Sequence, residues 1–268
     1  MEILGYLCSL LIGISLGTLG SGGSILTVPI MVYLLSIDPV DATGYSLFVV
    51  GITSAVGFLN LSRKDTVDFK KALIFAIPSL VFVYLTRIYL VHTIPNQIPF
   101  SDALVISKDR LFMILFAILM LIVAGKIIFS KSDKESREES EYQQNYFILI
   151  LAAIGSGILT GFLGVGGGFI IIPALLFFGN VLPKLCVGTS LLIIAGNSFI
   201  GFTTELIQRK GEIDYGFLTL FSVISIVGVF IGTHILSSIS SKQTKNAFGY
   251  MVLVVGMYII VRELFLRH

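Results

Sequence analysis

Charged residues are scarce in this chain, tryptophan is absent and cysteine occurs only twice. Charged side chains make up 13% of the 268 residues, whereas about a quarter is usual in soluble domains, so the composition argues against a water-soluble fold. Cys8 and Cys186 both lie in apolar surroundings, which favours two small buried side chains over a disulfide or a metal site. The net charge of +2 is too small to indicate a nucleic-acid partner.

The sequence also lacks the residue groupings that enzymes need. No Ser-His-Asp arrangement, no cluster of metal ligands and no phosphate-binding Walker loop emerges from it. We therefore expect no catalytic residues, no metal, no cofactor and no enzymatic activity. Because an ATPase module is missing as well, any transport would be driven by a gradient or by a separate subunit.

Long apolar segments dominate what is there. Hydrophobic residues make up 55% of the chain, and mean hydropathy is +0.96. Apolar runs of roughly 18 to 30 residues alternate with short polar stretches, which is typical of membrane-spanning helices. The first run, residues 3–19, lacks the basic start of a secretory signal and recurs at 147–163. The predicted fold class is an all-α integral membrane protein, with the lipid bilayer as one partner.

The apolar segments fall into two tandem repeats. An offset of 144 residues aligns 13–58 with 157–202 without a gap, and 15 of the 46 pairs are identical. Nine of these identities are glycine or proline, which concern backbone shape rather than hydrophobicity. We expect a first transmembrane repeat at 1–130, a charged cytoplasmic linker at 131–145 and a second transmembrane repeat at 146–268, with about four transmembrane segments in each repeat.

The distribution of positive charge predicts the orientation. With eight spans and a cytoplasmic N-terminus, 12 of the 18 Lys and Arg residues fall on the inner side, so the positive-inside rule favours two cytoplasmic termini. This scheme places Arg87 and His234 toward the outer ends of their spans and Glu205 at the inner end of its span. Snorkelling to the interface is the simpler interpretation for Arg87, and Glu205 is read as an interface residue. Arg87 and His234 are also weak candidates for coupling or gating.

The first segment of each repeat is too long for one straight span. Its roughly 32 residues would measure about 48 Å as a helix, against a hydrocarbon core of about 30 Å. The segment must therefore break, tilt or fold back, and we expect broken or re-entrant first segments. A full hairpin would give five spans in each repeat and inverted halves, which is the alternative to the eight-span scheme.

Glycine clusters mark the places where these segments are expected to break. The candidate substrate-binding residues there are Gly20, Ser21, Gly22, Gly23 and Ser24 in the first repeat, and Gly164, Gly166, Gly167 and Gly168 in the second. The half-helix after each cluster would point its free N–H groups at an anion. Close helix packing is the competing interpretation, which we prefer for the glycine pairs 13/17 and 157/161. A dinucleotide fingerprint is disfavoured because no strand precedes the glycines.

The second segment of each repeat carries a row of small polar side chains. Ser46 and Ser54 share one helix face in the first repeat. The second repeat has Thr189, Ser190, Asn197 and Ser198 at the matching or adjacent positions. Such rows could line a pathway, although a single hydroxyl more often bonds to its own helix. Asn197 is the stronger candidate, because a carboxamide in the middle of a span is costly without a partner.

The two glycine-rich stretches also resemble a known family. Residues 17–29 read GTLGSGGSILTVP and residues 161–173 read GFLGVGGGFIIIP, and each is followed by a Gly-Thr-Ser type segment, at 43–46 and 187–190. This pattern is similar to that of the TauE/SafE family of sulfite and organosulfonate transporters. The resemblance implies a multi-pass carrier in a bacterial or archaeal cytoplasmic membrane for sulfite, sulfoacetate, other organosulfonates or related carboxylates, coupled to protons.

The sequence thus predicts a secondary transporter whose partner is a small anionic substrate bound at paired helix breaks. A passive anion channel and a non-transporting membrane scaffold are the alternatives, and a homo-oligomer is left open. Exact substrate, direction of transport and coupling ion do not follow from the sequence.

Overall fold

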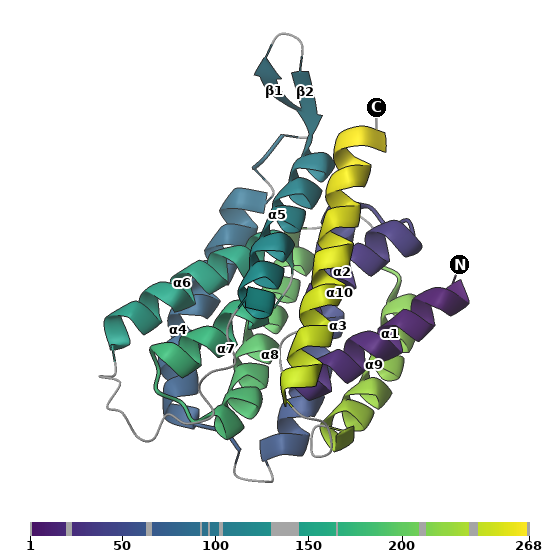
Figure 1. Cartoon of the computed structure of the whole chain (residues 1–268). Coiled ribbons are helices and arrows are strands. Elements are labelled where there is room, and N and C mark those ends of the chain that lie inside the picture. The colour runs from purple at the N-terminus through teal and green to yellow at the C-terminus, as the bar shows by residue number, and fades with distance from the viewer. Residues whose placement is uncertain are drawn as a thin grey trace.

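The chain folds into a bundle of helices with one short β-hairpin, as the computed structural model in Figure 1 shows. The structure describes residues 2–19, 23–62, 66–91, 93–95, 97–101, 104–129, 145–164, 166–208, 213–235 and 241–266. In the first half the elements are α1 (Glu2–Leu19), α2 (Ser24–Pro29), the π-helical η1 (Ile30–Leu34), α3 (Pro39–Ser62), α4 (Phe69–Leu85), the π-helical η2 (Thr86–Val91), β1 (Gln97–Ser101), β2 (Leu104–Ser107) and α5 (Lys108–Phe129). In the second half they are α6 (Tyr146–Leu163), α7 (Gly168–Phe177), α8 (Pro183–Gln208), α9 (Tyr215–Ile235), α10 (Ser241–Val261) and the π-helical η3 (Arg262–Leu266).

The helical membrane fold is confirmed in its main features. Five helical segments in the described part of the chain are long and apolar enough to cross a bilayer, namely α3, α4 with η2, α6, α8 and α9. The all-α expectation overlooked the antiparallel strands β1 and β2, in which Ile98 pairs with Ile106. These short strands carry β-branched residues between two helices, a composition that favours an extended backbone. The expected linker, residues 131–145, lies outside the described residues except for Asn145, which caps α6.

Apolar side chains also cover the outside of the bundle. On α4, Leu73, Ile77 and Val81 are each at least half exposed. On α9, Val223 and Val227 are half exposed as well. The fourfold spacing places each set on one helix face. An apolar exterior of this kind suits contact with lipid and not with water.

The first segment of each half breaks at its glycine cluster and folds back on itself. Gly23, just before α2, packs against Ile12 and Leu16 of α1, and Gly5 near the start of α1 packs against Leu35 after η1. α2 and η1 therefore run antiparallel to α1. Helix α1 ends at Leu19 before α2 begins at Ser24, and α6 ends at Leu163 before α7 begins at Gly168. The return of the chain favours the hairpin alternative over the eight-span scheme.

A contact between η2 and α8 shows that the eight-span scheme placed Arg87 and Glu205 on the wrong sides of the membrane relative to each other. Arg87 Nη2 lies 3.4 Å from Glu205 Oε2, although the scheme placed Arg87 at the outer end of its span and Glu205 at the inner end. That assignment is wrong. The reason is the hairpin, because a fold-back reverses the direction of every helix that follows it in the chain. One fold-back precedes Arg87 and two precede Glu205, so Arg87 changes ends while Glu205 does not, and the two side chains come to the same end of the bundle.

Helices of one half pack mainly against helices of the other. The largest helix contacts pair α1 with α9, α3 with α8, α5 with α10 and α4 with α6. Gly13 and Gly17 of α1 lie directly against Gly228 and Gly232 of α9, so small residues let two backbones approach closely. The packing interpretation of the glycine pairs 13/17 and 157/161 is confirmed, since Gly157 lies against the Ser79 carbonyl of α4.

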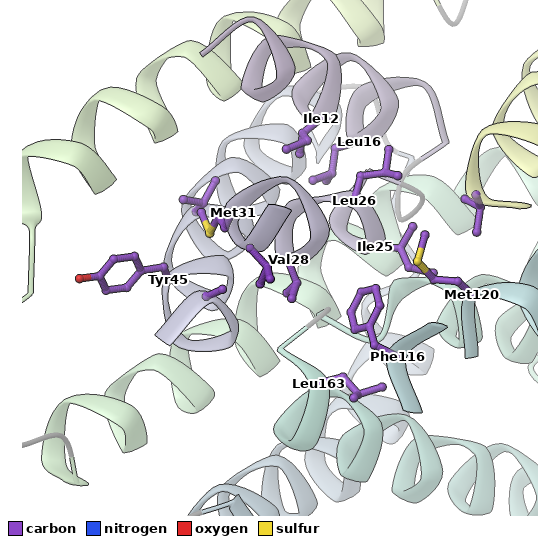
Figure 2. Packing of buried hydrophobic residues seen from close by; sticks show 14 of the residues in the cluster. Ile12, Leu16, Ile25, Leu26, Val28, Met31, Tyr45, Phe116, Met120 and Leu163 are labelled. Atoms are coloured by element: carbon purple, nitrogen blue, oxygen red, sulfur yellow. The ribbon is translucent and has the colours of Figure 1, made fainter. Parts of the chain in front are cut away.

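The largest apolar core lies where the first hairpin meets α5. Figure 2 shows Ile25 of α2 beside Met120 and Phe116 of α5, with Leu163 at the end of α6 close by. All four side chains are at most 2% exposed. Packing of this kind holds the first hairpin in place through van der Waals contacts, because lipid supplies no hydrophobic driving force between helices.

Candidate functional site

The break between α6 and α7 is held open by glycines in the left-handed region. Gly164 has φ 70°, and Gly166 and Gly167 both have φ 69°. Residues with a Cβ occupy this region at a cost of about 1–2 kcal/mol each, whereas glycine adopts it without that cost. Gly167 is the residue before α7 and provides no side-chain cap, and the amides of Ile170 and Ile171 both bond to its carbonyl. The amides that precede these two have no acceptor within the helix, as in any helix first turn.

This break lies in the middle of the bundle. A Cβ added at Gly166 would meet Val50 of α3, together with Ile194 and Ser198 of α8. Val50 and Ile194 are near the midpoints of their helices. The break thus sits at the contact between α3 and α8, at about the depth where a bilayer offers no water to satisfy backbone groups.

Two hydroxyls of α6 face the break. A Cβ added at Gly167 would meet Thr160 Oγ1 and Ser156 Oγ, so the glycine leaves a space beside both oxygens. Both side chains are fully buried, and in the part of the chain that the structure describes neither hydroxyl has a hydrogen-bond partner. An unsatisfied buried hydroxyl costs about 1–3 kcal/mol. Two of them at one backbone break indicate a site that receives a ligand or water.

Other candidate residues share this lack of partners. Among the described residues, the buried side-chain atoms without a hydrogen bond include Ser46 Oγ, Ser54 Oγ, Ser198 Oγ and Asn197 Nδ2, and also Thr27 Oγ1 of α2, which the sequence analysis did not single out. The Oδ1 atom of Asn197 accepts from Ser79 Oγ at 2.6 Å, which fixes the amide and leaves its nitrogen available. These atoms stand out because buried Thr53 and Thr204 bond to their own helix backbone in the ordinary way.

The remaining candidates divide into those with structural contacts and those that are not described. Thr189 Oγ1 donates to the Leu185 carbonyl and accepts from Asp68 N, and Ser190 Oγ donates to the Val187 carbonyl. Gly168 begins α7, and Ser24 begins α2 as a fully buried residue. Gly20, Ser21 and Gly22 lie outside the described residues, so the expected meeting of the two glycine clusters stays a prediction.

Arg87 is fully buried, so the snorkelling interpretation is wrong. Its Nη1 donates to Thr43 Oγ1 at 3.0 Å and to the Gly161 carbonyl at 3.3 Å, and a Cβ added at Gly164 would touch Thr43. The guanidinium therefore adjoins the end of α6 where the break begins. Sequence reasoning took the long apolar run around Arg87 to end in an accessible interface, but the structure buries that end in the bundle.

Glu205 is the functional candidate that sequence reasoning missed. It is 2% exposed, pairs with Arg87 and packs against Gly44 of α3. Its reading as an interface residue is wrong. The sequence signal that could have found it is Gly44 in the first turns of α3. This glycine has no side chain, and the Glu205 side chain occupies the space that is left. An ion pair with so little exposure is expensive to desolvate and adds little to stability, which makes Arg87 and Glu205 candidates for a functional role.

His234 does not belong to this group. It lies in the last turn of α9 and is exposed. Tyr215 begins α9 and follows Glu205 by only ten residues, so it lies at the same end of the bundle as Glu205. His234 lies 19 residues further along the same helix, which is about 28 Å away. Arg87 and His234 therefore lie toward opposite ends of the bundle.

A surface cavity of about 520 Å³ opens at the end of the bundle that carries Arg87 and Glu205. It is lined by Tyr6, Leu35, Ser36, Ile37, Asp38, Asp41, Tyr45, Asp214 and Phe217. None of the candidate substrate-binding residues lines it, and its three aspartates disfavour an anion. We place the candidate site at the glycine break, where buried donors lack partners. Among described residues no group of three or more His, Cys, Asp or Glu side chains is arranged to hold a metal ion.

Comparison with known proteins gives consistent matches over almost the whole chain. The sequence profile described as "Sulfite exporter TauE/SafE" matches residues 5–259. A "Probable membrane transporter protein" of Xylella fastidiosa (strain Temecula1) is 30% identical over 260 residues, covering 94% of this chain and 92% of that protein. The "Probable membrane transporter protein YunE" of Bacillus subtilis is 26% identical, covering 97% of this chain and 99% of that protein. A similarly named protein of Methanocaldococcus jannaschii, MJ0441, is 26% identical with 94% of each chain covered. No solved structure matches significantly.

Proposed function

The chain belongs to the sulfite exporter TauE/SafE family, and from this premise we propose that it is a secondary transporter of small sulfur-containing anions, coupled to protons. The substrate class comprises sulfite, sulfoacetate, other organosulfonates and related carboxylates. We place the binding site at the break between α6 and α7. The observation that carries this proposal is the pair of buried, unpartnered hydroxyls of Ser156 and Thr160 beside Gly167.

The chemistry of this break suits an oxyanion. The N-terminal end of α7 presents free N–H groups and the positive end of the helix dipole. Ser156, Thr160 and Ser198 add three hydroxyls that can donate to ligand oxygens. Asn197 Nδ2 is a further donor without a partner among the described residues. Donors outnumber carboxylates at this place, as a site for a small anion requires.

We further infer that the two halves are structural repeats related by an approximate two-fold axis. α1 packs on α9 and α6 packs on α4, while α3 pairs with α8 and α5 with α10. The first and fourth α-helices of the two halves thus exchange partners, as two-fold symmetry requires. Matching hydrogen bonds support this: Asp68 N donates to Thr189 Oγ1, and Asp214 N donates to Tyr45 OH. The described part of the chain has five α-helices on each side of the linker, α1–α5 and α6–α10, and this odd number supports inverted halves.

The orientation of the chain in the membrane then differs from the eight-span scheme. Contacts of Tyr6 with Phe217 and of Tyr33 with Glu263 bring both termini to one end of the bundle, whereas α5 ends and α6 begins at the opposite end. Eleven of the 18 Lys and Arg residues belong in sequence to the opposite end: Arg63, Lys64, Lys70, Lys71, Lys126, Lys131, Lys134, Arg137, Lys184, Lys242 and Lys245. We propose that the linker is cytoplasmic and the termini are external. Alkaline phosphatase fused to the C-terminus should then be active, because it folds only outside the cytoplasm, and an inactive fusion would argue for cytoplasmic termini.

Transport assays test the main proposal. Purified protein in liposomes loaded with unlabelled sulfite or sulfoacetate should take up the labelled anion by counterflow, and a pH gradient should drive its accumulation. Flux that rises linearly with concentration and shows no counterflow would favour a passive channel. Absence of flux for every anion of the class would favour a membrane scaffold.

A further inference from the structure

We propose that Arg87 and Glu205 form an exchangeable ion pair that couples anion binding to proton binding. In the empty protein the Glu205 carboxylate is the counter-ion of the Arg87 guanidinium. When Glu205 takes up a proton it releases the guanidinium, which becomes the counter-ion of the transported anion. This inference rests on the proposed transport function and names the residues that couple it to protons.

The position of Arg87 links the ion pair to the binding site. Its Nη1 reaches the Gly161 carbonyl in the last turn of α6 and the hydroxyl of Thr43, and Thr43 lies against Gly164, the first residue of the break. One arm of the guanidinium is thus anchored at the break. The Nε and Nη2 atoms make no hydrogen bond within the described residues, and Arg87 is 0% exposed. These two donors are what a bound oxyanion would need.

Glu205 is positioned to exchange with an anion and not to hold Arg87 rigidly. The 3.4 Å between Nη2 and Oε2 is an ion pair without a hydrogen bond and lies beyond the usual range of about 2.7–2.9 Å for such charge-assisted bonds. The carboxylate packs beside Gly44, where the helix backbone offers it space. An anion with two oxygens would engage the guanidinium better than this carboxylate does.

The charge count then fixes the stoichiometry. A buried positive charge needs one negative partner, because an unpaired buried charge costs several kcal/mol. Glu205 and a monovalent anion therefore compete for Arg87. The anion binds when a proton has neutralised Glu205, so that one proton accompanies one monovalent anion and no net charge moves.

The charged neighbours of the pair support this balance. On α5, Lys108 is 9% exposed and interacts electrostatically with Glu205 and Arg87, and with Asp109, the next residue in the chain. On α3, Asp41 is one turn before Gly44, and α6 carries no charged side chain. Lys108 adds positive charge near the pair, which favours entry of an anion.

The chain itself offers a matched control. At the sequence-equivalent place in the other half, Asn60 Nδ2 donates to Thr233 Oγ1 at 3.0 Å. Thr233 matches Arg87 at an offset of 146 residues, and Asn60 lies next to the residue that matches Glu205. This neutral contact joins the same kinds of helices but has no proton to exchange.

The experiment compares wild type, Glu205→Gln and Asn60→Ala in liposomes, with labelled isethionate, a sulfonate monoanion whose charge is constant between about pH 5 and 8. Wild type and Asn60→Ala should show counterflow that slows as pH rises, and accumulation of about tenfold for one unit of pH gradient. Glu205→Gln should keep counterflow, lose its pH dependence and lose accumulation. Accumulation by Glu205→Gln at the wild-type level would overturn the inference, and so would loss of counterflow in a monodisperse Glu205→Gln protein.

A charge exchange separates coupling from structure. The double variant Arg87→Glu with Glu205→Arg keeps an ion pair but moves the guanidinium away from Thr43 and Gly161. It should be folded, as judged by its melting temperature in detergent, and should show no counterflow. Wild-type transport by this variant would mean that the pair is only structural. Absence of counterflow in wild type would instead refute the proposed function itself.

Discussion

The two glycine breaks have nearly the same sequence but different surroundings. Gly167 of the second break faces the hydroxyls of Ser156 and Thr160, whereas Gly23 of the first break faces Ile12 and Leu16, at the positions 144 residues earlier. Both backbones fold back, and in the described structure two unpartnered hydroxyls adjoin Gly167, whereas Thr27 Oγ1, one turn after Gly23, is the one such hydroxyl on α2. The comparison teaches that glycine determines where the chain turns, and that the neighbouring helix determines whether the turn can bind an anion.

The same contrast extends away from the breaks. Asn197 of the second half corresponds to Thr53 of the first. Thr53 bonds to the Val49 carbonyl of its own helix, whereas the Nδ2 atom of Asn197 has no partner among described residues. This contrast supports the proposed anion site at the second break.

The largest difference in stability is expected between the ion pair and its neutral counterpart. Arg87→Ala leaves the Glu205 carboxylate in a buried place without its cation, which should lower the free energy of unfolding by about 3–5 kcal/mol. Asn60→Ala removes one hydrogen bond and should cost about 1 kcal/mol. Denaturant unfolding in detergent measures both. Equal losses would mean that the two ends of the bundle do not differ energetically.

Gly167→Ala should come next in size. The new Cβ would meet Thr160 and Ser156 and would sit at φ 69°, so we expect a loss of about 1–3 kcal/mol and of transport. Gly155→Ala in α6 is the control, because a Cβ there has nothing within 4 Å. It should be neutral or slightly stabilising. Full transport by Gly167→Ala would remove the break from the mechanism.

Thr160→Val separates binding from stability. Because its hydroxyl has no partner in the described structure, the substitution should leave stability unchanged or raise it by up to about 1 kcal/mol. The same change should weaken anion binding about tenfold, through loss of one hydrogen bond to the ligand. Thr53→Val should do the opposite, with slightly lower stability and unchanged binding. Melting temperatures with and without sulfite report both effects, and equal sulfite shifts in wild type and Thr160→Val would contradict the assignment.

The smallest effects on stability and transport are expected at a pair of matching hydrogen bonds, one in each half, that hold loops to helices. Tyr45→Phe and Thr189→Val each remove an acceptor for the backbone amide of an aspartate, Asp214 in one case and Asp68 in the other. Each should cost about 0.5–1.5 kcal/mol and leave the affinity for anions unchanged. A strong transport defect in Thr189→Val alone would mean that this residue serves the substrate and not the fold.

Much of the fold could be predicted because it depends on backbone chemistry that glycine and apolar runs reveal. The breaks before Gly23 and at Gly164 follow from segments too long for a bilayer, and the packing of Gly13 follows from small residues four apart. The direction of the chain after each break could not be predicted, because a 32-residue run has the same composition whether it bends or returns. The error for Arg87 and Glu205 came from this direction.

The hydroxyl sites were predictable only in part. Ser190 and Ser198 look alike in sequence, yet one donates to the Val187 carbonyl and the other has no partner in the described structure. Whether a helical serine bonds to its own helix depends on what lies opposite its hydroxyl. Opposite Ser198 lies Gly166, which has no Cβ and leaves space beside the hydroxyl. That information belongs to the packing of three helices and not to any local pattern.

The most direct test of the account is to locate a bound oxyanion. Selenite has the shape and charge of sulfite, and its selenium scatters anomalously, so crystals grown with selenite would reveal its position without ambiguity. We predict one site beside Gly167, within hydrogen-bonding distance of Thr160 and Ser198. A peak beside Ile12 and Leu16 at the first break, or no peak at selenite concentrations that inhibit sulfite transport, would contradict the assignment of the second break as the anion site.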